Sequence, residues 1–362
     1  MWNQNVEIMK ITMLVLRFYP QIGGVEKHVL RLSEELTKKG HEVAVVTTNP
    51  GLAAPAAEKL NGILIYRIPN VRPSKIWAWF IKNRHIISQA DVIHCHDYPT
   101  FILWYLPFRF LYPKKPVYVT FHGYEGIVPI PRRILLLRRL TEKMTLGNIC
   151  IGDYISKWYG TQPTGVLYGG VDLPQGATGG ADTADVHHLD VGVFVGRLEK
   201  DTGIMEYLQA LKILMYDYGL SPEGYICGDG TLRDVVQREL ADHNINFKML
   251  GFVRTPEDYL KKSRFAFVSG YLGMLEAMAY RKQVFNIAID PLRDDYLGLI
   301  PNAENIMVTA KSPEELAERF FYLSNNPQET ERYLKEAYAF AAERSWASVA
   351  DAYLAVWQML KH

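Results

Sequence analysis

The sequence predicts an α/β protein with two Rossmann-like, doubly wound domains that face one another across a cleft. Strand and helix patterns alternate along the 362 residues in two sets, one before residue 174 and one after residue 189. Such alternation favours parallel sheets covered by helices on both faces. The stretch 174–189 is rich in Gly and small polar residues and lacks periodicity. We therefore expect a flexible loop near the domain boundary there.

The first set begins with an apolar run at 10–16, which is typical of a strand buried in a parallel sheet. An amphipathic helix at 25–39 and a second strand at 41–47 complete a strand–helix–strand unit. Apolar runs predict the remaining strands of this half at 63–67, 92–94, 117–121, 149–151 and 166–168.

The second set repeats the architecture without repeating the sequence. Apolar runs predict its strands at 191–195, 224–227, 247–250, 265–268 and 283–286. Helices are expected to begin at Gly203, Thr231 and Leu275. Three final helices are expected at 313–324, 329–344 and 346–361.

Composition limits the classes of protein that fit. A hydrophobic content of 48% with 22% charged residues is typical of a globular chain and excludes a disordered one. The three cysteines, Cys95, Cys150 and Cys227, form no metal-binding or Cys-x-x-Cys pattern, so a reduced, cytoplasmic setting is expected. Residues 1–7 lack the features of a signal peptide. No stretch approaches the ~20 apolar residues that span a bilayer.

Charge is divided unevenly along the chain. Residues 1–175 hold 21 Lys and Arg against 12 Asp and Glu, a balance of +9, whereas the remainder has 19 against 27, a balance of −8. The basic half contains an aromatic and apolar segment at 101–112 and a basic helix at 131–140 that includes Arg132 and Arg133. These segments predict either peripheral contact with an anionic membrane or ordinary core helices with solvated arginines.

Several candidate site residues follow predicted strands. In open α/β sheets, ligands bind beyond the carboxyl ends of the strands. The first such loop contains Gly23 and Gly24, whose lack of a side chain lets the backbone approach a phosphate before a helix begins. Glu276 stands alone in an apolar helical stretch, and burying an unpaired carboxylate is costly, so we expect it to have a partner.

Four motifs together resemble the signatures of retaining GT-B glycosyltransferases of the family-four, group 1 type. They are Gly23-Gly24-Val25-Glu26, the Gly-Arg-Leu segment at 196–203, the Gly-x-Gly turn at 228–233 and Leu275-Glu-Ala-Met-Ala279. The resemblance covers nearly the whole chain. It implies domains at 1–172 and 173–344, with a helix at 345–362 that packs back on the first domain.

The resemblance implies a role for each matching residue. Glu276 corresponds to the second Glu of a Glu-x7-Glu motif and would hold the ribose of a nucleotide-sugar. Position 268, where the first Glu would fall, is Val. Catalysis is expected from His122, Arg197 and Glu276. The other donor-binding residues would be Gly23, Gly24, Lys200, Thr202, Gly228, Gly230, Phe252, Val253, Ser269, Gly270 and Tyr271. The acceptor side would include His96, Asp97, Arg132 and Arg133.

The function implied is retaining transfer of a hexose from a UDP- or GDP-sugar to a glycan, lipid-linked or cell-envelope acceptor. The resemblance implies that no metal or other cofactor is needed. The His94/His96 pair could suggest a metal, but it has no third ligand at a recognisable spacing. No nucleic-acid partner is expected either. The enzyme would be cytoplasmic, either free or peripheral at the inner face of the cell membrane. Two alternatives remain open: a non-catalytic sugar-nucleotide-binding partner subunit and a GT-B sugar-nucleotide epimerase.

Overall fold

The structure is a computed structural model that describes residues 8–21, 23–49, 51, 54–69, 72–123, 128–174 and 189–359. The loop expected at 174–189 and the extension at 1–7 lie outside these residues, apart from positions 174 and 189. The chain forms two compact units. The first comprises Met1–Leu167 and Trp346–His362, and the second comprises Tyr168–Ser345.

The first unit is built around a sheet in the order β3-β4-β2-β1-β5-β6-β7-β8, parallel except for the edge pair β3 and β4. Its strands are β1 (Lys10–Leu14), β2 (Glu42–Thr48), β3 (Ala57–Leu60), β4 (Ile63–Ile68), β5 (Val92–His96), β6 (Val117–Phe121), β7 (Gly147–Ile151) and β8 (Gly165–Leu167). Its helices are α1 (Gly24–Lys38), α2 (Pro73–Lys82), α3 (His85–Ser88), α4 (Tyr98–Thr100), the π-helix η1 (Phe101–Tyr105), α5 (Leu106–Leu111), α6 (Arg132–Met144), α7 (Tyr154–Tyr159) and α16 (Trp346–Met359).

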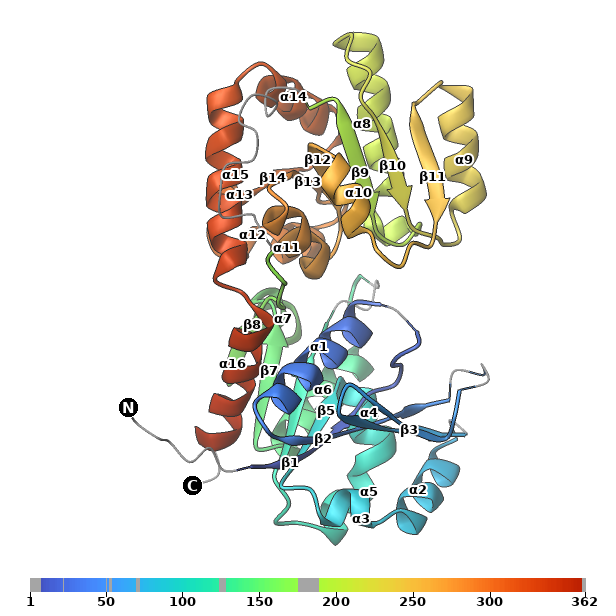
Figure 1. Ribbon diagram of the computed structural model, residues 1–362, viewed down its shortest axis with the longest axis vertical. Coiled ribbons are helices and arrows are strands. Elements are labelled where there is room, and N and C mark those ends of the chain that lie inside the picture. Colours follow the sequence, from blue (N-terminus) through green and yellow to red (C-terminus); the bar gives the residue numbers. More distant parts are fainter. Residues whose placement is uncertain are drawn as a thin grey trace. The chain divides into compact units, whose positions relative to one another are not determined.

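Helix α16 belongs to the first unit although it follows the second unit in the chain. It packs beside α1, as Figure 1 shows. An ion pair at 2.6 Å joins Lys39 to Asp351, and the Tyr118 hydroxyl donates to the Trp357 carbonyl at 3.1 Å. Trp357 and Tyr353 are fully buried, so the interior of the first unit includes aromatic side chains from the last helix.

The second unit has a parallel six-stranded sheet in the order β11-β10-β9-β12-β13-β14. Its strands are β9 (Val191–Val195), β10 (Glu223–Cys227), β11 (Phe247–Gly251), β12 (Phe265–Val268), β13 (Gln283–Ile287) and β14 (Val308–Ala310). Its helices are the 3₁₀ turn η2 (Lys200–Thr202), α8 (Ile204–Asp217), α9 (Arg233–Asp242), α10 (Glu257–Lys262), α11 (Tyr271–Ala279), α12 (Pro291–Gly298), α13 (Ala303–Ile306), α14 (Pro313–Ser324) and α15 (Pro327–Ala342).

The sheet order of the second unit is 3-2-1-4-5-6 when its strands are numbered from β9, which is the order of dinucleotide-binding Rossmann sheets. Phe265, Phe267, Phe285 and Phe320 form its aromatic centre, with ring centroids 4.9–6.2 Å apart. The prediction of two doubly wound α/β domains is therefore confirmed in the architecture of each unit.

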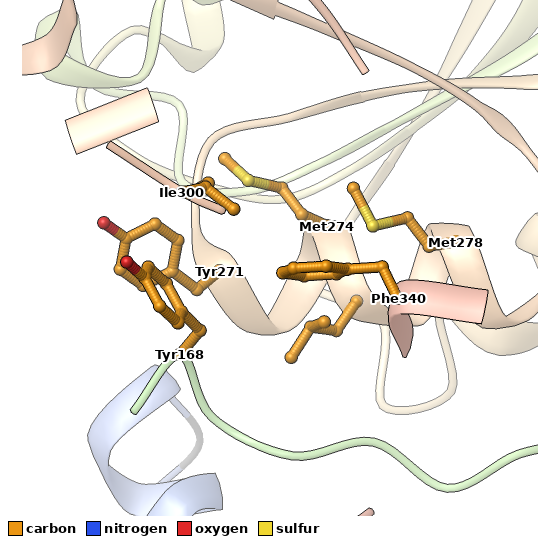
Figure 2. Close-up of a pocket in the computed structure, with 7 residues that line it drawn as sticks. Tyr168, Tyr271, Met274, Met278, Ile300 and Phe340 are labelled. Carbon is orange, nitrogen blue, oxygen red and sulfur yellow. The ribbon is translucent and has the colours of Figure 1, made fainter. Parts of the chain in front are cut away.

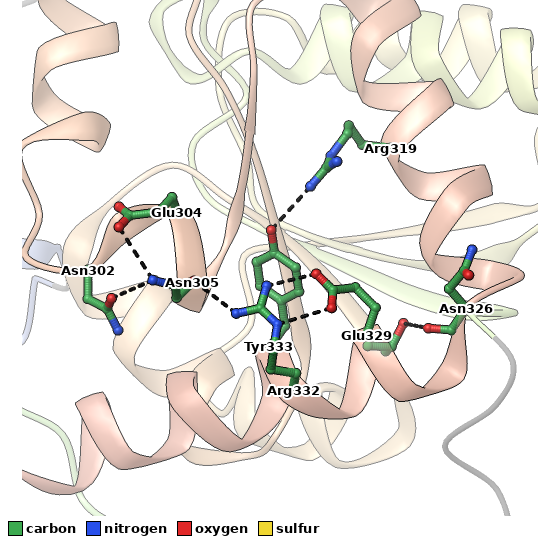
Figure 3. Close-up of polar contacts among 9 residues, drawn as sticks. Asn302, Glu304, Asn305, Arg319, Asn326, Glu329, Arg332 and Tyr333 are labelled. Carbon is green, nitrogen blue, oxygen red and sulfur yellow. Dashed lines mark hydrogen bonds and ion pairs between the residues drawn. The ribbon is translucent and has the colours of Figure 1, made fainter.

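Surface hydrogen bonds join three helices of the second unit (Figure 3). Arg332 of α15 pairs bidentately with Glu329 at 3.0 and 2.7 Å, and donates to Asn305 of α13 at 2.8 Å. Arg319 of α14 donates to the Tyr333 hydroxyl at 3.2 Å. These bonds hold α15 in place, and α15 packs against α11, the helix that carries Glu276.

Candidate functional site

In the second unit, β9 lies between β10 and β12. The chain adds β10 and β11 on one side of β9 and then crosses over to add β12 on the other side, so the strand order reverses at β9. Ligands of open α/β sheets bind beyond the strand ends at such a point. Arg197 follows β9 and Ser269 follows β12. The two loops are in close contact, because a methyl group built on Gly196 would lie 3.2 Å from Ser269 Oγ. The structure thus brings the predicted donor residues of both loops to one edge of the sheet.

Arg197 presents its guanidinium at the surface of this edge. Its side chain is 67% exposed and pairs with Asp201 at 2.7 Å. An exposed ion pair of this kind contributes about 1 kcal/mol or less. The guanidinium can therefore exchange one carboxylate for a diphosphate, to which it can donate two hydrogen bonds. Lys200 is also exposed in the adjoining turn.

Thr202 has a structural role in that turn. Its side chain is buried, and its hydroxyl lies 2.9 Å from the Arg197 carbonyl and 2.7 Å from the Glu199 carbonyl. A hydroxyl has one proton, which these two carbonyls already share. Thr202 therefore fixes the backbone beneath Arg197 and keeps Lys200 and Arg197 on the same short turn.

Gly228 and Gly230 let the loop after β10 lie directly on the loop after β9. A side chain at Gly228 would clash with the Gly196 carbonyl, and one at Gly230 would clash with the Leu198 carbonyl. The helix expected to begin at Thr231 begins two residues later, and neither Asp229 nor Thr231 caps it. That helix, α9, begins at Arg233 after Leu232 and has no side-chain cap.

Thr231 is held by Glu199 instead. The Glu199 carboxylate accepts from the Thr231 backbone amide at 2.9 Å and from its hydroxyl at 2.5 Å. These two bonds lower the pKa of Glu199. Asp229 is likewise bonded outside the helix end, since it accepts from the Gly230 amide at 2.9 Å and pairs with Arg233 at 3.0 Å.

Glu276 lies within α11 and is 8% exposed. This helix begins at Tyr271, four residues before the start that was predicted at Leu275. The earlier start comes from tertiary contacts of Tyr271, which stacks on Tyr296 with ring centroids 4.1 Å apart. The Tyr271 amide donates to the Tyr296 hydroxyl at 3.1 Å, and the Tyr271 hydroxyl donates to the Tyr296 carbonyl at 2.8 Å.

Ser269 and Gly270 are also fixed before this helix begins. Arg293 is buried, donates to the Ser269 carbonyl and lies 4.4 Å from the centre of the Tyr296 ring. Gly270 has room for a side chain, because a methyl group built on it would meet nothing within 4 Å. The turn after β12 is therefore held by hydrogen bonds on both sides and has open space at Gly270.

The other face of α11 is closed by packing. Figure 2 shows Met274 and Met278 of α11 beside Tyr168, Ile300 and Phe340. The cavity that they enclose has a volume of about 10 Å³. This is at most the room for one water molecule. This face of α11 therefore packs against its neighbours and leaves no room for a ligand larger than a water molecule.

Phe252 and Val253 follow β11, the outermost strand on the same side of the sheet as β10. Phe252 is 57% exposed. Gly251, which precedes it, has φ +69°, a conformation that favours glycine. An exposed aromatic ring at a strand's carboxyl end can stack on a planar base.

The first unit gathers four histidines: His94 and His96 lie in β5, His122 follows β6, and His28 lies on α1. His96 Nδ1 and His122 Nε2 lie 3.0 Å apart, and the His28 ring lies 5.1 Å from that of His122. His94 lies 5.1 Å from His96. The sequence predicted His96 and His122 for this site. It did not predict the part that His28 plays, because that residue lies on α1.

All four imidazoles are held neutral. Burial is the main cause that lowers the pKa of His122, to about 3, and the nearby Arg138 lowers it further. Burial also lowers the pKa values of His28, His94 and His96 well below their ordinary value, and each additionally senses His122. At neutral pH, His122 can therefore take part in a hydrogen bond with a ligand as an uncharged group but cannot act as a charged one.

Asp97 anchors His122 from an unfavourable backbone conformation. Its φ and ψ are 65° and 157°, a region populated mainly by glycine. Its carboxylate accepts from the His122 amide at 2.9 Å. Burial raises the pKa of Asp97, while Arg138 and the amides of His122 and Gly123 oppose that rise. Backbone conformations of this kind concentrate at functional sites.

Arg138 is a residue of the site that sequence reasoning missed. It is 1% exposed, donates to the Gly123 carbonyl at 3.0 Å and lies 3.9 Å from the centre of the Tyr159 ring. The buried stripe of α6 is Ile134, Arg138 and Thr141, at spacings of four and three. That spacing was the available signal. Arg132 and Arg133 are exposed at the start of the same helix.

The loop after β1 brings Gly23 and Gly24 to the start of α1. Gly24 is exposed, and a methyl group built on it would meet nothing within 4 Å. The preceding part of the loop is fixed by Arg67, a buried side chain that donates to the Tyr19 carbonyl at 2.9 Å and pairs with Glu58. Gly24 is thus accessible at the end of β1, the strand next to β5.

The part of the chain that the structure describes includes no helix with both the length and the apolar character that a bilayer crossing requires. In the same part of the chain, no group of three or more His, Cys, Asp or Glu is arranged to hold a metal ion.

Comparison with known proteins identifies the class. The family model "Glycosyltransferase Family 4" matches residues 22–174, and the model "Glycosyl transferases group 1" matches residues 187–340. A solved glycosyltransferase from Rickettsia africae superposes with a TM-score of 0.73 at 14% identity, covering 98% of this chain and 99% of that one. This protein therefore has the GT-B fold and belongs to the glycosyltransferases.

Within that class, the chain belongs to the family-four, group 1 type. It is 39% identical over 102 residues to the uncharacterized glycosyltransferase MJ1607 of Methanocaldococcus jannaschii, covering 25% of this chain and 26% of that protein. It is 26% identical over 219 residues to the GDP-mannose:cellobiosyl-diphosphopolyprenol alpha-mannosyltransferase of Xanthomonas campestris, covering 56% of each. The matches thus span about a quarter and about half of these two relatives.

Proposed function

We propose that this glycosyltransferase moves a hexose from a UDP- or GDP-sugar to a lipid-linked or cell-envelope glycan acceptor, with retention of configuration at the sugar. The main support is the arrangement of the second unit, whose Rossmann strand order places Arg197, Ser269 and the helix of Glu276 beyond β9 and its neighbour β12. This is the position at which such sheets bind nucleotides.

In this proposal the second unit holds the donor. Arg197 pairs with the diphosphate, with Lys200 beside it, and Glu276 accepts hydrogen bonds from the ribose hydroxyls. Phe252 and Val253 line the base. Charge develops on the diphosphate as the bond from the sugar to phosphate breaks, and a guanidinium already in place stabilises that charge. No metal is required by this division of roles.

The first unit supplies the acceptor side. The acceptor hydroxyl attacks the anomeric carbon from the side that the leaving diphosphate vacates, so the configuration is retained. The oxygen of that diphosphate takes the hydroxyl proton. Neutral His122 positions a sugar hydroxyl through a hydrogen bond, and His96, Asp97, Arg132 and Arg133 lie on the acceptor side.

A lipid-linked acceptor is favoured by two observations. The relative from Xanthomonas campestris is named for a diphosphopolyprenol acceptor and a GDP-mannose donor. Residues 1–175 of this chain carry a balance of +9 and include a basic helix, α6, with exposed Leu136 and Leu140. Both features suit an anionic, partly apolar substrate at a membrane surface.

The donor assignment is tested by calorimetry with a panel of UDP- and GDP-sugars. The variant Glu276→Ala should lower the affinity of the preferred donor at least about tenfold, because a ribose hydrogen bond to a carboxylate is worth ~1.5–3 kcal/mol. Glu304→Ala, which removes an exposed carboxylate from the same unit, is the matched control. Equal donor affinity in Glu276→Ala and wild type would overturn the ribose assignment. The anomeric configuration of the product, read by NMR, tests retention.

A second candidate is a sugar-nucleotide-binding subunit that does not transfer. It is favoured by Val268, which stands where the first Glu of the motif would fall and is fully buried at the end of β12. Such a subunit would bind the donor and release no nucleoside diphosphate in the presence of acceptor lipids. Transfer by the purified chain excludes it.

A further inference from the structure

A groove lies beside the histidine cluster of the first unit, between the π-helix η1 and helix α6. Its lining is apolar except at Arg133 and the Tyr98 hydroxyl, and its volume is about 290 Å³. The lining residues are Tyr98, Pro99, Ile102 and Leu103 from α4 and η1, and Arg133, Ile134 and Leu137 from α6.

Two residues link the groove to the part of the first unit that holds His122. Tyr98 lines it and directly follows Asp97, the residue that anchors His122. The Arg138 guanidinium lies 5.9 Å from the centre of the Tyr98 ring and donates to the carbonyl of Gly123, next to His122. The π-helix that supplies Ile102 and Leu103 is a rare form, and π-helical turns often occur at functional sites.

We propose that this groove binds the apolar chain of a lipid-phosphate acceptor, with Arg133 pairing with the phosphate at the groove's rim. This inference rests on the proposed function and adds the subsite that selects the acceptor. The occupant is an amphiphile because the lining requires an apolar chain and the rim offers a cation. No carboxylate of the described residues forms an ion pair with Arg133, so its charge is available to an anion.

The volume sets the length of chain that the groove accepts. An apolar cavity of ~150 Å³ binds benzene, so a groove of about 290 Å³ takes roughly a dozen carbon atoms. Each methylene group withdrawn from water strengthens binding roughly fourfold. Affinity should therefore rise steeply with chain length up to about twelve carbons and then level off.

The test uses n-alkyl phosphates of six to sixteen carbons with the full chain, by calorimetry below their micelle concentrations. We expect affinity to rise to a plateau at about twelve carbons. Leu137→Gln should flatten the rise, because it places an amide in the groove. Leu136→Gln is the matched control, since Leu136 is 68% exposed on the same helix and does not line the groove. Affinity that does not depend on chain length, or equal effects of the two variants, would overturn the proposal.

Arg133 is tested separately. Arg133→Gln should weaken every alkyl phosphate roughly tenfold and leave the corresponding alkyl alcohols unaffected, because only the phosphate meets the charge. Arg139→Gln, an exposed arginine of the same helix, is the control. If both arginine variants and Leu136→Gln weaken binding to anionic vesicles while alkyl phosphate affinity stays constant, this surface contacts a membrane and the groove proposal fails.

Donor binding separates this inference from the proposed function. If the wild-type chain binds alkyl phosphates with the expected chain dependence but binds no UDP- or GDP-sugar, the groove stands and the proposed function fails. If it transfers sugar equally well to chain-free and long-chain acceptors, the proposed function stands and the groove proposal fails.

Discussion

The indole N–H of Trp357 donates to Nδ1 of His94 at 3.1 Å. An indole nitrogen can only donate, so Nδ1 is the acceptor and neutral His94 carries its proton on Nε2. His94 Nε2 lies 2.7 Å from Thr120 Oγ1 and donates this proton to it. Thr120 Oγ1 lies 2.7 Å from the Tyr353 hydroxyl oxygen. Tyr353 lies 2.9 Å from His28 Nε2. All four hydrogen bonds form when each group donates to the next one in the series. Trp357 donates to His94, His94 to Thr120, Thr120 to Tyr353, and Tyr353 to His28.

The same reasoning fixes the imidazole that faces the ligand. His96 Nε2 lies 3.4 Å from the Met13 sulfur, which is a weak acceptor, so His96 carries its proton on Nε2. His96 Nδ1 then accepts from His122 Nε2–H at 3.0 Å. His122 Nδ1 remains as an acceptor for a hydroxyl group. The hydrogen-bond network thus places the His122 proton on Nε2 and leaves Nδ1 free to accept a hydrogen bond from the sugar hydroxyl of the proposed mechanism.

The buried histidines should make the first unit sensitive to acid. The pKa values of these histidines in the folded state lie below the unfolded value of 6.5. Below pH 6.5 the unfolded state therefore binds protons that the folded state does not, and the free energy of unfolding decreases as the pH falls. His122, whose folded pKa is about 3, alone loses about 1.4 kcal/mol of stability between pH 6.5 and 5.5, and the other three histidines add losses of the same sign. Urea denaturation at pH 7.5 and 5.5 measures this loss. The exposed variant His85→Gln should show the same loss, and equal stability at the two pH values would contradict the prediction.

Tyr353→Phe should break the directed chain of hydrogen bonds. The variant removes the donor to His28 and the acceptor of Thr120, and leaves both groups buried. We expect a decrease in the free energy of unfolding of about 2–3 kcal/mol, because buried polar groups without partners cost ~1–3 kcal/mol each. Tyr66→Phe, in the same unit and without a hydroxyl hydrogen bond among the described residues, is the control and should lose less than about 0.5 kcal/mol. A similar loss in both variants would show that this series of hydrogen bonds does not contribute to the free energy of unfolding.

Gly228→Ala should distort the donor site. Its methyl group would clash with the Gly196 carbonyl, which is backbone and cannot move without shifting the start of the Arg197 loop. Overpacking of this kind costs ~1–3 kcal/mol or more. We expect a lower melting temperature and loss of nucleotide-sugar binding. Gly298→Ala, where a methyl group would meet nothing within 4 Å, should retain both. Unchanged donor affinity in Gly228→Ala would contradict the close approach of these loops.

Lys282→Met should stabilise the second unit. Lys282 is 8% exposed, and burial lowers its pKa from 10.5 to about 8, with the nearby Arg264 adding to the shift. Below pH 8 Lys282 is charged in the folded and in the unfolded protein. Burial of that charge in the folded protein then lowers the free energy of unfolding by about 3 kcal/mol. As the pH rises from 8 to 10.5, the unfolded state retains the proton and wild-type stability increases. The variant should be more stable at pH 7 and lack that increase, as measured by urea denaturation. Lys248→Met, an exposed lysine of the same unit, is the control.

The sequence predicted the strands well because an apolar run between polar turns is a local signal. The predicted strands at 117–121, 191–195 and 265–268 have the bounds that the structure shows for β6, β9 and β12. Placement of Arg197, His122 and Ser269 beyond strand ends followed from the same signal. The start of α11 could not be read locally, because it depends on Tyr271 stacking on Tyr296.

The histidine cluster was largely hidden for a related reason. His28 and Tyr353 are separated by 325 positions in the chain, and no local pattern indicates that they meet. Arg138 was ambiguous because α6 carries arginines on more than one face, and only packing decides which of them is buried. Sequence reasoning therefore found the loops that approach a ligand and missed the side chains that support them.

Helix α16 completes the interior of the first unit, yet the ribosome makes it only after residues 168–345. At synthesis rates of ~5–20 residues per second, those residues delay it by roughly ten to forty seconds. During that time the nascent amino-terminal half exposes the surface that Tyr353 and Trp357 will later cover. The second unit has no such delay, so we expect it to acquire its native structure first even though its residues are translated later.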